Sequence, residues 1–188
     1  MGKMKVESCG DIEGLKVLTP QVFGDSRGYF METYQQKDFA EAGITDLFVQ
    51  DNQSASRRGV LRGLHFQKNY SQAKLVRVVS GEVFDVAVDL REGSPSFGHW
   101  HGEILSAENK KQYYIPQGFA HGFLVLSEVA EFVYKCSDFY HPDDEGGIRF
   151  DDAEVGVEWP FQEGVELILS EKDQKWQSFR EYCREKGL

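Results

Sequence analysis

The chain is poor in cysteine and contains no Cys-x-x-Cys pair. Its three cysteines, Cys9, Cys136 and Cys183, lie far apart, which argues against a disulfide framework and against a cysteine-based metal site. The chain also lacks any run of about 18 apolar residues, and its first residues lack the apolar segment of a signal peptide. We therefore expect a cytoplasmic protein with reduced thiols that does not bind a membrane.

Basic residues are in the minority. The 188 residues include 21 Lys and Arg against 31 Asp and Glu, a formal net charge of -10, which argues against nucleic acid as a partner. Acidic residues are nevertheless missing between Asp51 and Glu82, where the sequence carries only basic charges: Arg57, Arg58, Arg62, Lys68, Lys74 and Arg77. This window predicts either a site for an anionic ligand or an ordinary basic surface, and charge alone does not separate the two.

Long helical patterns are also scarce, and most of the chain has the pattern of short strands. The segment Val83–Leu90 alternates apolar and polar residues, as a strand with one face on a core does, and turn residues flank it. Similar segments follow one another along the chain: Tyr29–Thr33, Leu47–Gln50, Val60–Phe66, Lys74–Val79, Gly102–Leu105, Gln112–Ile115, Gly122–Leu126 and Glu131–Lys135. This spacing predicts a mainly β protein, an antiparallel sandwich or barrel that fits a jelly roll best.

Two helical segments are expected beside the strands. The first, Gln36–Ala42, ends before Gly43, which suits a left-handed C-cap. The second runs from Ser170 to about Lys186, with apolar side chains three and four residues apart: Trp176, Phe179, Tyr182 and Cys183. No repeat or linker divides the chain, so we predict one domain over residues 1–188, with a jelly-roll core at about 15–160 and a C-terminal helical segment at about 170–186.

The segment RRGVLRGLHFQ contains a histidine and an arginine three residues apart, His65 and Arg62. Strand alternation places Leu61, Gly63 and His65 on one face, and Arg62 then points to the other face unless the glycine introduces a bulge. A single histidine in a strand is more often structural than catalytic, so this segment needs a second group before it indicates a site.

A second segment, YIPQGFAHGF, has the pattern Pro-x-Gly-x-x-His at Pro116, Gly118 and His121, which is similar to the second sequence motif of the cupin superfamily. Many cupins bind a metal through a His-x-His pair and a carboxylate. Here the corresponding strand offers only His65, and the pair at His99 and His101 lies in a polar stretch outside it. We therefore expect no metal site.

Ordered motifs from Thr19-Pro20 to Lys172-Asp173 carry a closer resemblance: VFGDSRGYFMETY, FVQDNQS, GVLRGLHFQ, KLVRVVSGEVFDVAVDLR, LSAEN, YIPQGFAHGF, YKC, VGVEWP and LSEKD. In these motifs the chain resembles the dTDP-4-dehydrorhamnose 3,5-epimerase family. The resemblance implies a cupin-like β jelly roll, a homodimer that exchanges strands and side chains, and catalysis without metal or organic cofactor. The implied substrate is a dTDP-4-dehydro-6-deoxyhexose, inverted at carbons 3 and 5 on the way to dTDP-L-rhamnose.

The same resemblance implies the catalytic groups. His65 in LRGLHFQ corresponds to the family's base, Asp173 in LSEKD to its dyad partner, and Tyr134 in EFVYKC to the acid on the opposite face of the sugar. Such an arrangement suits the chemistry, because a carbon next to a ketone is only weakly acidic and needs a base within hydrogen-bond reach. A cation must also stabilise the enolate oxygen, and Lys74 in KLVR is the candidate.

The substrate contacts implied by the resemblance are Arg27, Glu32, Gln50, Asn52, Arg62, Lys74, His121, Tyr140, Glu145 and Lys172. Arg27 and Arg62 suit a diphosphate, since guanidinium groups bind phosphate oxygens bidentately, and Tyr140 is expected to stack on the thymine ring. The residue patterns by themselves favour plainer roles. Asp173 completes an S-x-x-D helix cap with Ser170, and Tyr134 has the spacing of a core residue.

Three other functions remain open at the level of sequence. A single-site 3- or 5-epimerase of another deoxysugar pathway would share the same motifs. A non-catalytic cupin that binds a sugar nucleotide would keep the binding residues without turnover. A metal-dependent cupin oxygenase would lose its activity on chelation.

Overall fold

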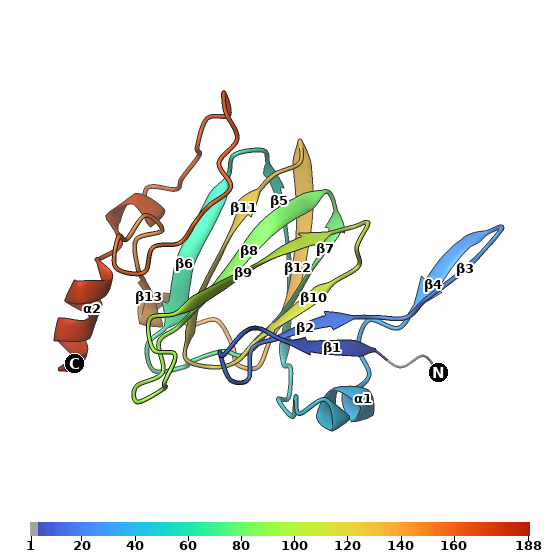
Figure 1. The fold of residues 1–188 in the computed structure, drawn as a ribbon, viewed down its shortest axis with the longest axis horizontal. Helices are drawn as coiled ribbons and strands as arrows, with labels where there is room; N and C mark the ends of the chain where they lie inside the picture. The colour runs from blue at the N-terminus through green and yellow to red at the C-terminus, as the bar shows by residue number, and fades with distance from the viewer. Residues whose placement is uncertain (1–3) are drawn as a thin grey trace.

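The computed structural model describes residues 4–188, which form two facing antiparallel sheets with a hairpin and short helices around them (Figure 1). The six-stranded sheet has the order β1 (Lys5–Ser8), β2 (Lys16–Thr19), β10 (Gln112–Ile115), β7 (Lys74–Ser80), β12 (Val129–Cys136) and β5 (Gln50–Arg57). The five-stranded sheet has the order β13 (Glu145–Gly147), β6 (Leu61–Gln67), β11 (Phe119–Val125), β8 (Glu82–Asp89) and β9 (Trp100–Ser106). The predicted mainly β, antiparallel architecture is confirmed.

The main core lies between the two sheets. Val76 and Phe132 from the six-stranded sheet meet Val83, Ala87 and Phe123 from the five-stranded sheet in one buried cluster. The rings of Phe123 and Phe132 stack across the gap with centroids 4.3 Å apart. Because inward-facing side chains alternate along each strand, this layer supports the inner walls of both sheets.

The outer face of the five-stranded sheet is covered by the C-terminal part of the chain, drawn in orange and red in Figure 1. Leu64 on β6 and Val88 on β8 pack there in one cluster with Trp159 and Tyr182. Tyr182 belongs to helix α2 (Phe179–Lys186). The C-terminal segment is thus held against the strand that carries His65.

Helix α1 (Gln36–Glu41) matches the first predicted helix. The Gln35 side chain caps its N-terminus by accepting from the amides of Lys37 and Asp38, and Gly43 follows with φ +78°. Only glycine adopts this left-handed conformation without strain, so the predicted stop after Ala42 is confirmed.

The C-terminal helix is shorter than predicted. Helix α2 begins at Phe179, where Ser178 and Glu181 form a capping box, and a short 3-10 turn, η2 (Asp173–Lys175), precedes it. Trp176 separates the two with an extended backbone (ψ 149°). Gln177 instead bridges to Ile148 beside β13, so the expected continuous helix from Ser170 was wrong.

One strand prediction was displaced. We expected a strand at Leu47–Gln50, but β5 begins at Gln50 and continues through QDNQSASR to Arg57. This strand lies at the edge of its sheet, pairs with β12 alone, and exposes alternate side chains. An edge strand needs few apolar residues, so hydrophobic alternation does not reveal it.

Strands β3 (Val22–Asp25) and β4 (Gly28–Met31) form a separate hairpin that extends away from the body of the molecule (Figure 1). Val22, Phe23, Tyr29 and Phe30 on this hairpin are 42–67% exposed. Within residues 4–188, no helix has both the length and the apolar character needed to cross a membrane.

Candidate active site

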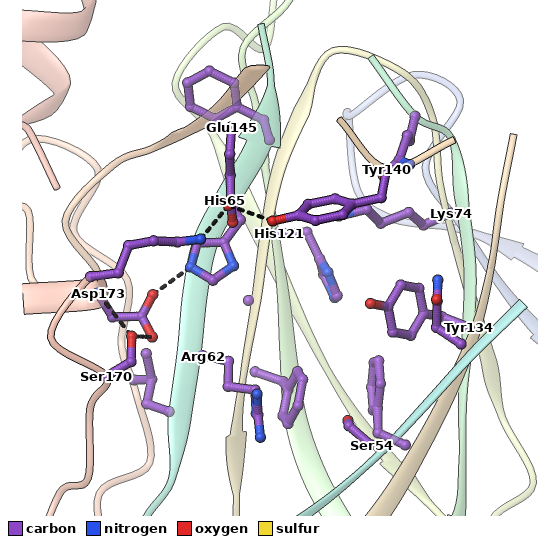
Figure 2. A pocket seen from close by; sticks show the side chains of 18 of the residues that line it. Ser54, Arg62, His65, Lys74, His121, Tyr134, Tyr140, Glu145, Ser170 and Asp173 are labelled. Atoms are coloured by element: carbon purple, nitrogen blue, oxygen red, sulfur yellow. Dashed lines mark hydrogen bonds and ion pairs between the residues drawn. The ribbon is translucent and has the colours of Figure 1, made fainter. Parts of the chain in front are cut away.

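A cavity of about 630 Å³ opens between the two sheets (Figure 2). Its walls come from β5, β6, β7, β11 and β12, together with segments 140–145 and 168–173. Eleven of the thirteen predicted site residues line this cavity: Gln50, Asn52, Arg62, His65, Lys74, His121, Tyr134, Tyr140, Glu145, Lys172 and Asp173.

Strand β6 carries Arg62 and His65 to the same cavity through a bulge. His121 on β11 pairs with His65, and Phe123 pairs with Arg62, so β6 advances three residues where β11 advances two. Gly63 lies inside this irregularity with φ +133°, and a Cβ there would lie 2.5 Å from the Gly122 Cα. Simple alternation, which points Arg62 away from His65, is therefore wrong here, and the glycine bulge named as the exception is present.

His65 is hydrogen-bonded to a buried carboxylate. Its Nε2 contacts Oδ1 of Asp173, which is 3% exposed, and Figure 2 shows the other ring nitrogen turned toward the cavity. The His65 ring meets Trp176 edge-on, with centroids 5.8 Å apart. Carboxylate and indole together fix the orientation of the imidazole.

Asp173 is itself held by three groups. Ser170 Oγ donates to its Oδ2 (2.7 Å), and Trp176 Nε1 donates to its Oδ1 (3.3 Å) beside His65. Burial alone would raise the pKa of Asp173, but the hydrogen bonds from His65, Ser170 and Trp176 hold it below the ordinary value. The Asp173 amide also donates to Ser170 Oγ (3.1 Å), so the cap contact predicted from S-x-x-D is present as well.

Tyr134 lies on the wall opposite His65, on β12 (Figure 2). It is partly buried and packs against the core through Phe132, with ring centroids 5.9 Å apart. Burial raises the pKa of the Tyr134 phenol, and the nearby Cys136 thiol adds to this effect. The phenol therefore keeps its proton at neutral pH and is available as an acid.

The floor of the cavity holds a buried charge cluster of Lys74, His121 and Asp85, of which only Asp85 was not predicted from the sequence. His121 Nε2 contacts both oxygens of Asp85, at 2.9 and 3.1 Å, and Asp85 is 0% exposed. Burial lowers the pKa of Lys74, while Cys136 and Asp85 act to raise it. The missed residue, Asp85, has a signal in VFDVAVDL, because it occupies the same strand face as Val83 and Ala87 in the core.

The cavity mouth is lined by polar groups that already contact one another. Tyr140 Oη donates to Glu145 Oε2 (3.0 Å), and Lys172 forms an ion pair with the same carboxylate oxygen. Gln50 Oε1 accepts from the Tyr140 amide (3.0 Å), and Gln50 Nε2 donates to Asn52 Oδ1 (3.0 Å). The mouth thus offers an exposed ring and several hydrogen-bonding groups.

Arg62 stands at the lower end of the cavity in Figure 2, near Ser54. Its Nε donates to Ser56 Oγ (3.2 Å). Arg62 is exposed, so its remaining guanidinium donors face solvent and are free to meet an anion.

Two predicted contacts are not in this cavity. Arg27 lies on the β3–β4 hairpin, where it is paired with Asp25, and Glu32 follows the same hairpin beside Phe39. The structure of one chain therefore does not bring Arg27 and Glu32 to His65, because the hairpin points away from the body (Figure 1).

The described residues, 4–188, contain no group of three or more His, Cys, Asp or Glu side chains arranged to hold a metal ion. His101 lies on β9 near Glu103 (3.8 Å), and His99 lies near Asp11 (3.7 Å), so the His-x-His pair does not contribute to the cavity.

Comparison with known proteins shows the family of this chain. The family model described as dTDP-4-dehydrorhamnose 3,5-epimerase matches residues 10–181. The dTDP-4-dehydrorhamnose 3,5-epimerase of Pseudomonas aeruginosa is 58% identical over 87% of this chain and 90% of its own length. The chain belongs to this family.

Solved structures agree with this family membership. A crystal structure of dTDP-6-deoxy-D-glucose-3,5-epimerase from Legionella pneumophila, in complex with dTDP-4-keto-L-rhamnose, has a TM-score of 0.92 and 51% identity, covering 97% of this chain and 96% of that one. The fold is therefore the cupin-like jelly roll of the dTDP-4-dehydrorhamnose 3,5-epimerase family, as predicted, and the chain is an isomerase of that family.

The same fold also supports a narrower reaction. A 3'-monoepimerase from Streptomyces bikiniensis, in complex with dTDP-quinovose, has a TM-score of 0.85 and 33% identity, covering 94% of this chain and 89% of that one. Within the epimerase family, fold alone thus does not determine how many carbons are inverted.

Proposed function

We propose that this chain converts dTDP-4-dehydro-6-deoxy-D-glucose to dTDP-4-dehydro-L-rhamnose by inverting carbons 3 and 5. The observation that carries the proposal is the position of the His65–Asp173 pair and the Tyr134 phenol on opposite walls of one cavity (Figure 2). A single group can return a proton only to the face from which it came. Inversion therefore requires a base on one face of the sugar and an acid on the other.

In this mechanism His65 removes the proton from the carbon next to the 4-keto group. With Nε2 directed at Asp173, the second ring nitrogen accepts the proton, and the buried carboxylate stabilises the resulting imidazolium. The electron pair of the broken C–H bond moves into the enolate, whose oxygen is stabilised by Lys74. Tyr134 then donates its proton to the carbon from the opposite face, and solvent restores both groups.

The remaining cavity residues bind the nucleotide part in this proposal. Arg62 contacts the diphosphate, since its guanidinium is exposed beside the cavity and matches phosphate geometry. Tyr140 stacks on the thymine ring, while Gln50, Asn52, Glu145 and Lys172 supply hydrogen bonds around it. His121 contacts the sugar from the cavity floor, where Asp85 orients it.

Turnover in D₂O tests the number of inverted carbons. The protein is incubated with dTDP-4-dehydro-6-deoxy-D-glucose, the product is trapped by a ketoreductase with NADPH, and deuterium is located by NMR. We expect label at carbons 3 and 5. Label at one carbon alone would establish the single-site epimerase, and binding of the sugar nucleotide without label or turnover would establish a non-catalytic binding protein.

We also propose a homodimer in which the β3–β4 hairpin reaches the cavity of a second copy. Support comes from the exposed Phe23, Tyr29 and Phe30 on a hairpin that leaves the body of the molecule (Figure 1). This arrangement takes Arg27 and Glu32 to the partner's nucleotide. Sedimentation equilibrium tests the dimer, and a monomer at micromolar concentration would contradict it.

A further inference from the structure

Gln67 ends β6 two residues after His65, and its side chain is almost fully buried (7% exposed). Its amide makes three hydrogen bonds, all to backbone. Nε2 donates to the carbonyls of Tyr70 (2.6 Å) and Phe139 (3.1 Å), and Oε1 accepts from the amide of His141 (2.6 Å). Both N–H groups of the side chain are thus used, and its oxygen is used as well.

Two of these three bonds are made to the chain neighbours of Tyr140. Gln67 donates to the carbonyl of Phe139, the residue before it, and accepts from the amide of His141, the residue after it. Tyr140 itself is 51% exposed, so packing does little to hold its ring. The ring is held at its hydroxyl by Glu145, and the Tyr140 amide donates to Gln50 Oε1 (3.0 Å). Gln67 holds the backbone on both sides of Tyr140.

The third bond of Gln67 reaches the loop after β6, which is fastened to the Tyr140 loop by further contacts. The rings of Tyr70 and His141 stack with centroids 3.9 Å apart. The Asp144 carboxylate accepts from the backbone amides of Asn69 and Tyr70, each at 2.9 Å. Gln67 thus contacts two loops, the one after β6 and the one that carries Tyr140, which also contact each other.

We propose that Gln67 is a positioning residue for the nucleotide, acting through Tyr140. It connects β6, which carries His65 and Arg62, to the loop that carries Tyr140. One strand therefore fixes the relative positions of the catalytic base, the diphosphate contact and the stacking ring. The inference rests on the proposed function, in which Tyr140 stacks on the nucleobase. It assigns Gln67 no contact with the reacting atoms.

The test is a double-mutant cycle of Gln67→Ala and Tyr140→Ala, with the Kd for dTDP measured by titration calorimetry. Tyr140→Ala should raise the Kd about tenfold, as expected for loss of one base–aromatic stack. Gln67→Ala should raise it about fivefold, which corresponds to about 1 kcal/mol. When Tyr140 is already alanine, Gln67→Ala should change the Kd less than about twofold, because the ring it positions is gone.

Kinetics separate positioning from general damage. Gln67→Ala should raise the KM for the sugar nucleotide in step with the Kd and lower kcat less than about threefold, because His65 and Asp173 keep their contacts. Gln67→Met keeps the approximate shape of the side chain and loses all three bonds, so it should raise the Kd about as much as Gln67→Ala, and it serves if the alanine variant fails to fold.

Ser127→Ala is the matched control, because Ser127 also bonds to backbone alone, outside the cavity. Its Oγ accepts from the Glu82 amide (2.8 Å) and donates to Val129 O (2.8 Å), with a longer contact to Glu82 O (3.4 Å). It should lower stability and leave the Kd for dTDP unchanged. An equal rise in Kd on Gln67→Ala with and without Tyr140 would overturn the inference. An unchanged Kd on Tyr140→Ala would instead overturn the proposed stacking itself.

Discussion

His121 contacts both carboxylate oxygens of Asp85 between the two sheets, with its Nε2 at 2.9 and 3.1 Å from them. Burial raises the pKa of Asp85, although His121 and Lys74 both act to lower it. Burial also lowers the pKa of His121, and the Asp85 carboxylate opposes that change. Each group thus limits the cost of burying the other.

Asp85→Ala should therefore destabilise the fold by about 3 kcal/mol, because His121 and Lys74 lose their buried counter-charge. Asp85→Asn keeps the shape and one acceptor, and it should cost about 1 kcal/mol. Urea unfolding followed by tryptophan fluorescence measures both. Asp151→Ala removes an exposed pair with Arg149 and should stay within about 0.5 kcal/mol of wild type. Equal losses for all three variants would contradict a special role for the buried pair.

The His65–Asp173 contact leads to a prediction about turnover. His65→Ala should lower kcat about a thousandfold, since general base catalysis contributes on this order, while the Kd for dTDP stays within about threefold. Asp173→Asn removes the charge that stabilises the imidazolium and should also lower kcat with little change in Kd. The coupled ketoreductase assay gives kcat.

A matched histidine control is available on β9. His101→Ala truncates a partly buried histidine outside the cavity, and it should leave kcat near the wild-type value. A comparable loss of dTDP binding in His65→Ala would show that this histidine acts in binding rather than in proton transfer.

Much of the sheet architecture could be predicted because alternation follows directly from one-sided burial. Strand β8 was found from its flanking turn residues although both of its faces are buried: Val83 and Ala87 enter the core between the sheets, and Val86 and Val88 pack under the C-terminal segment. Alternation fails where one-sided burial does not hold. It missed β5 at the sheet edge. The two-residue period does place Asp85 on the same face as Val83 and Ala87, but it does not indicate that the Asp85 carboxylate pairs with His121.

The site depended on contacts between distant parts of the chain. His65 and Asp173 are 108 residues apart, so no local pattern pairs them, and S-x-x-D alone indicates a helix cap. Family resemblance supplied the pairing, and the structure brings the two together. The three bonds of Gln67 also lie outside the reach of sequence patterns, because two of them join it to backbone 72 and 74 residues away.

The phenol of Tyr134 leads to a prediction about isotope exchange. Burial raises its pKa, so it is protonated at neutral pH, as the proposed acid must be. In Tyr134→Phe, His65 still removes the substrate proton, but no acid delivers one to the opposite face. Incubation in D₂O should therefore give substrate that is labelled with deuterium but not inverted, detected by NMR and mass spectrometry.

His65→Ala serves as the control for exchange. It lacks the proposed base and should give no label. If Tyr134→Phe gave inverted product at the wild-type rate, another group would have to be the acid. Loss of label together with loss of product would place Tyr134 in the deprotonation step instead.

A second buried carboxylate, Asp89, leads to a prediction about acid stability. Burial alone would raise its pKa, but hydrogen bonds from Arg91, Ser94 and Ser96 lower it from 3.8 to about 2. A group with a depressed pKa in the folded state stabilises the protein above its unfolded pKa, and this contribution is lost as the pH falls through the folded pKa. The wild type should therefore lose about 2 kcal/mol on this account between about pH 5 and pH 2.

Asp89→Asn should flatten this part of the stability curve, measured by urea unfolding at a series of pH values. Asp89 lies outside the cavity, so kcat at neutral pH should be unaffected in the folded variant. Glu41→Gln, an exposed change on α1, should keep the wild-type slope. An unchanged slope in Asp89→Asn would mean that other carboxylates carry the acid dependence.

The proposed exchange of hairpins predicts that two inactive variants restore activity when mixed. In the proposed dimer, Arg27→Ala removes a contact that each chain supplies to its partner, whereas His65→Ala removes the proposed base in the chain's own cavity. In a hybrid dimer, one cavity then carries both defects, and the other has an intact His65 and receives an intact Arg27. Unfolding and refolding an equal mixture should yield about a quarter of the wild-type kcat/KM per chain, since about half of the dimers are hybrids with one working site each. Refolding each variant alone provides the control and should give no gain. If Arg27 acts within its own chain, both cavities of every hybrid carry one defect, and the mixture stays as inactive as its components.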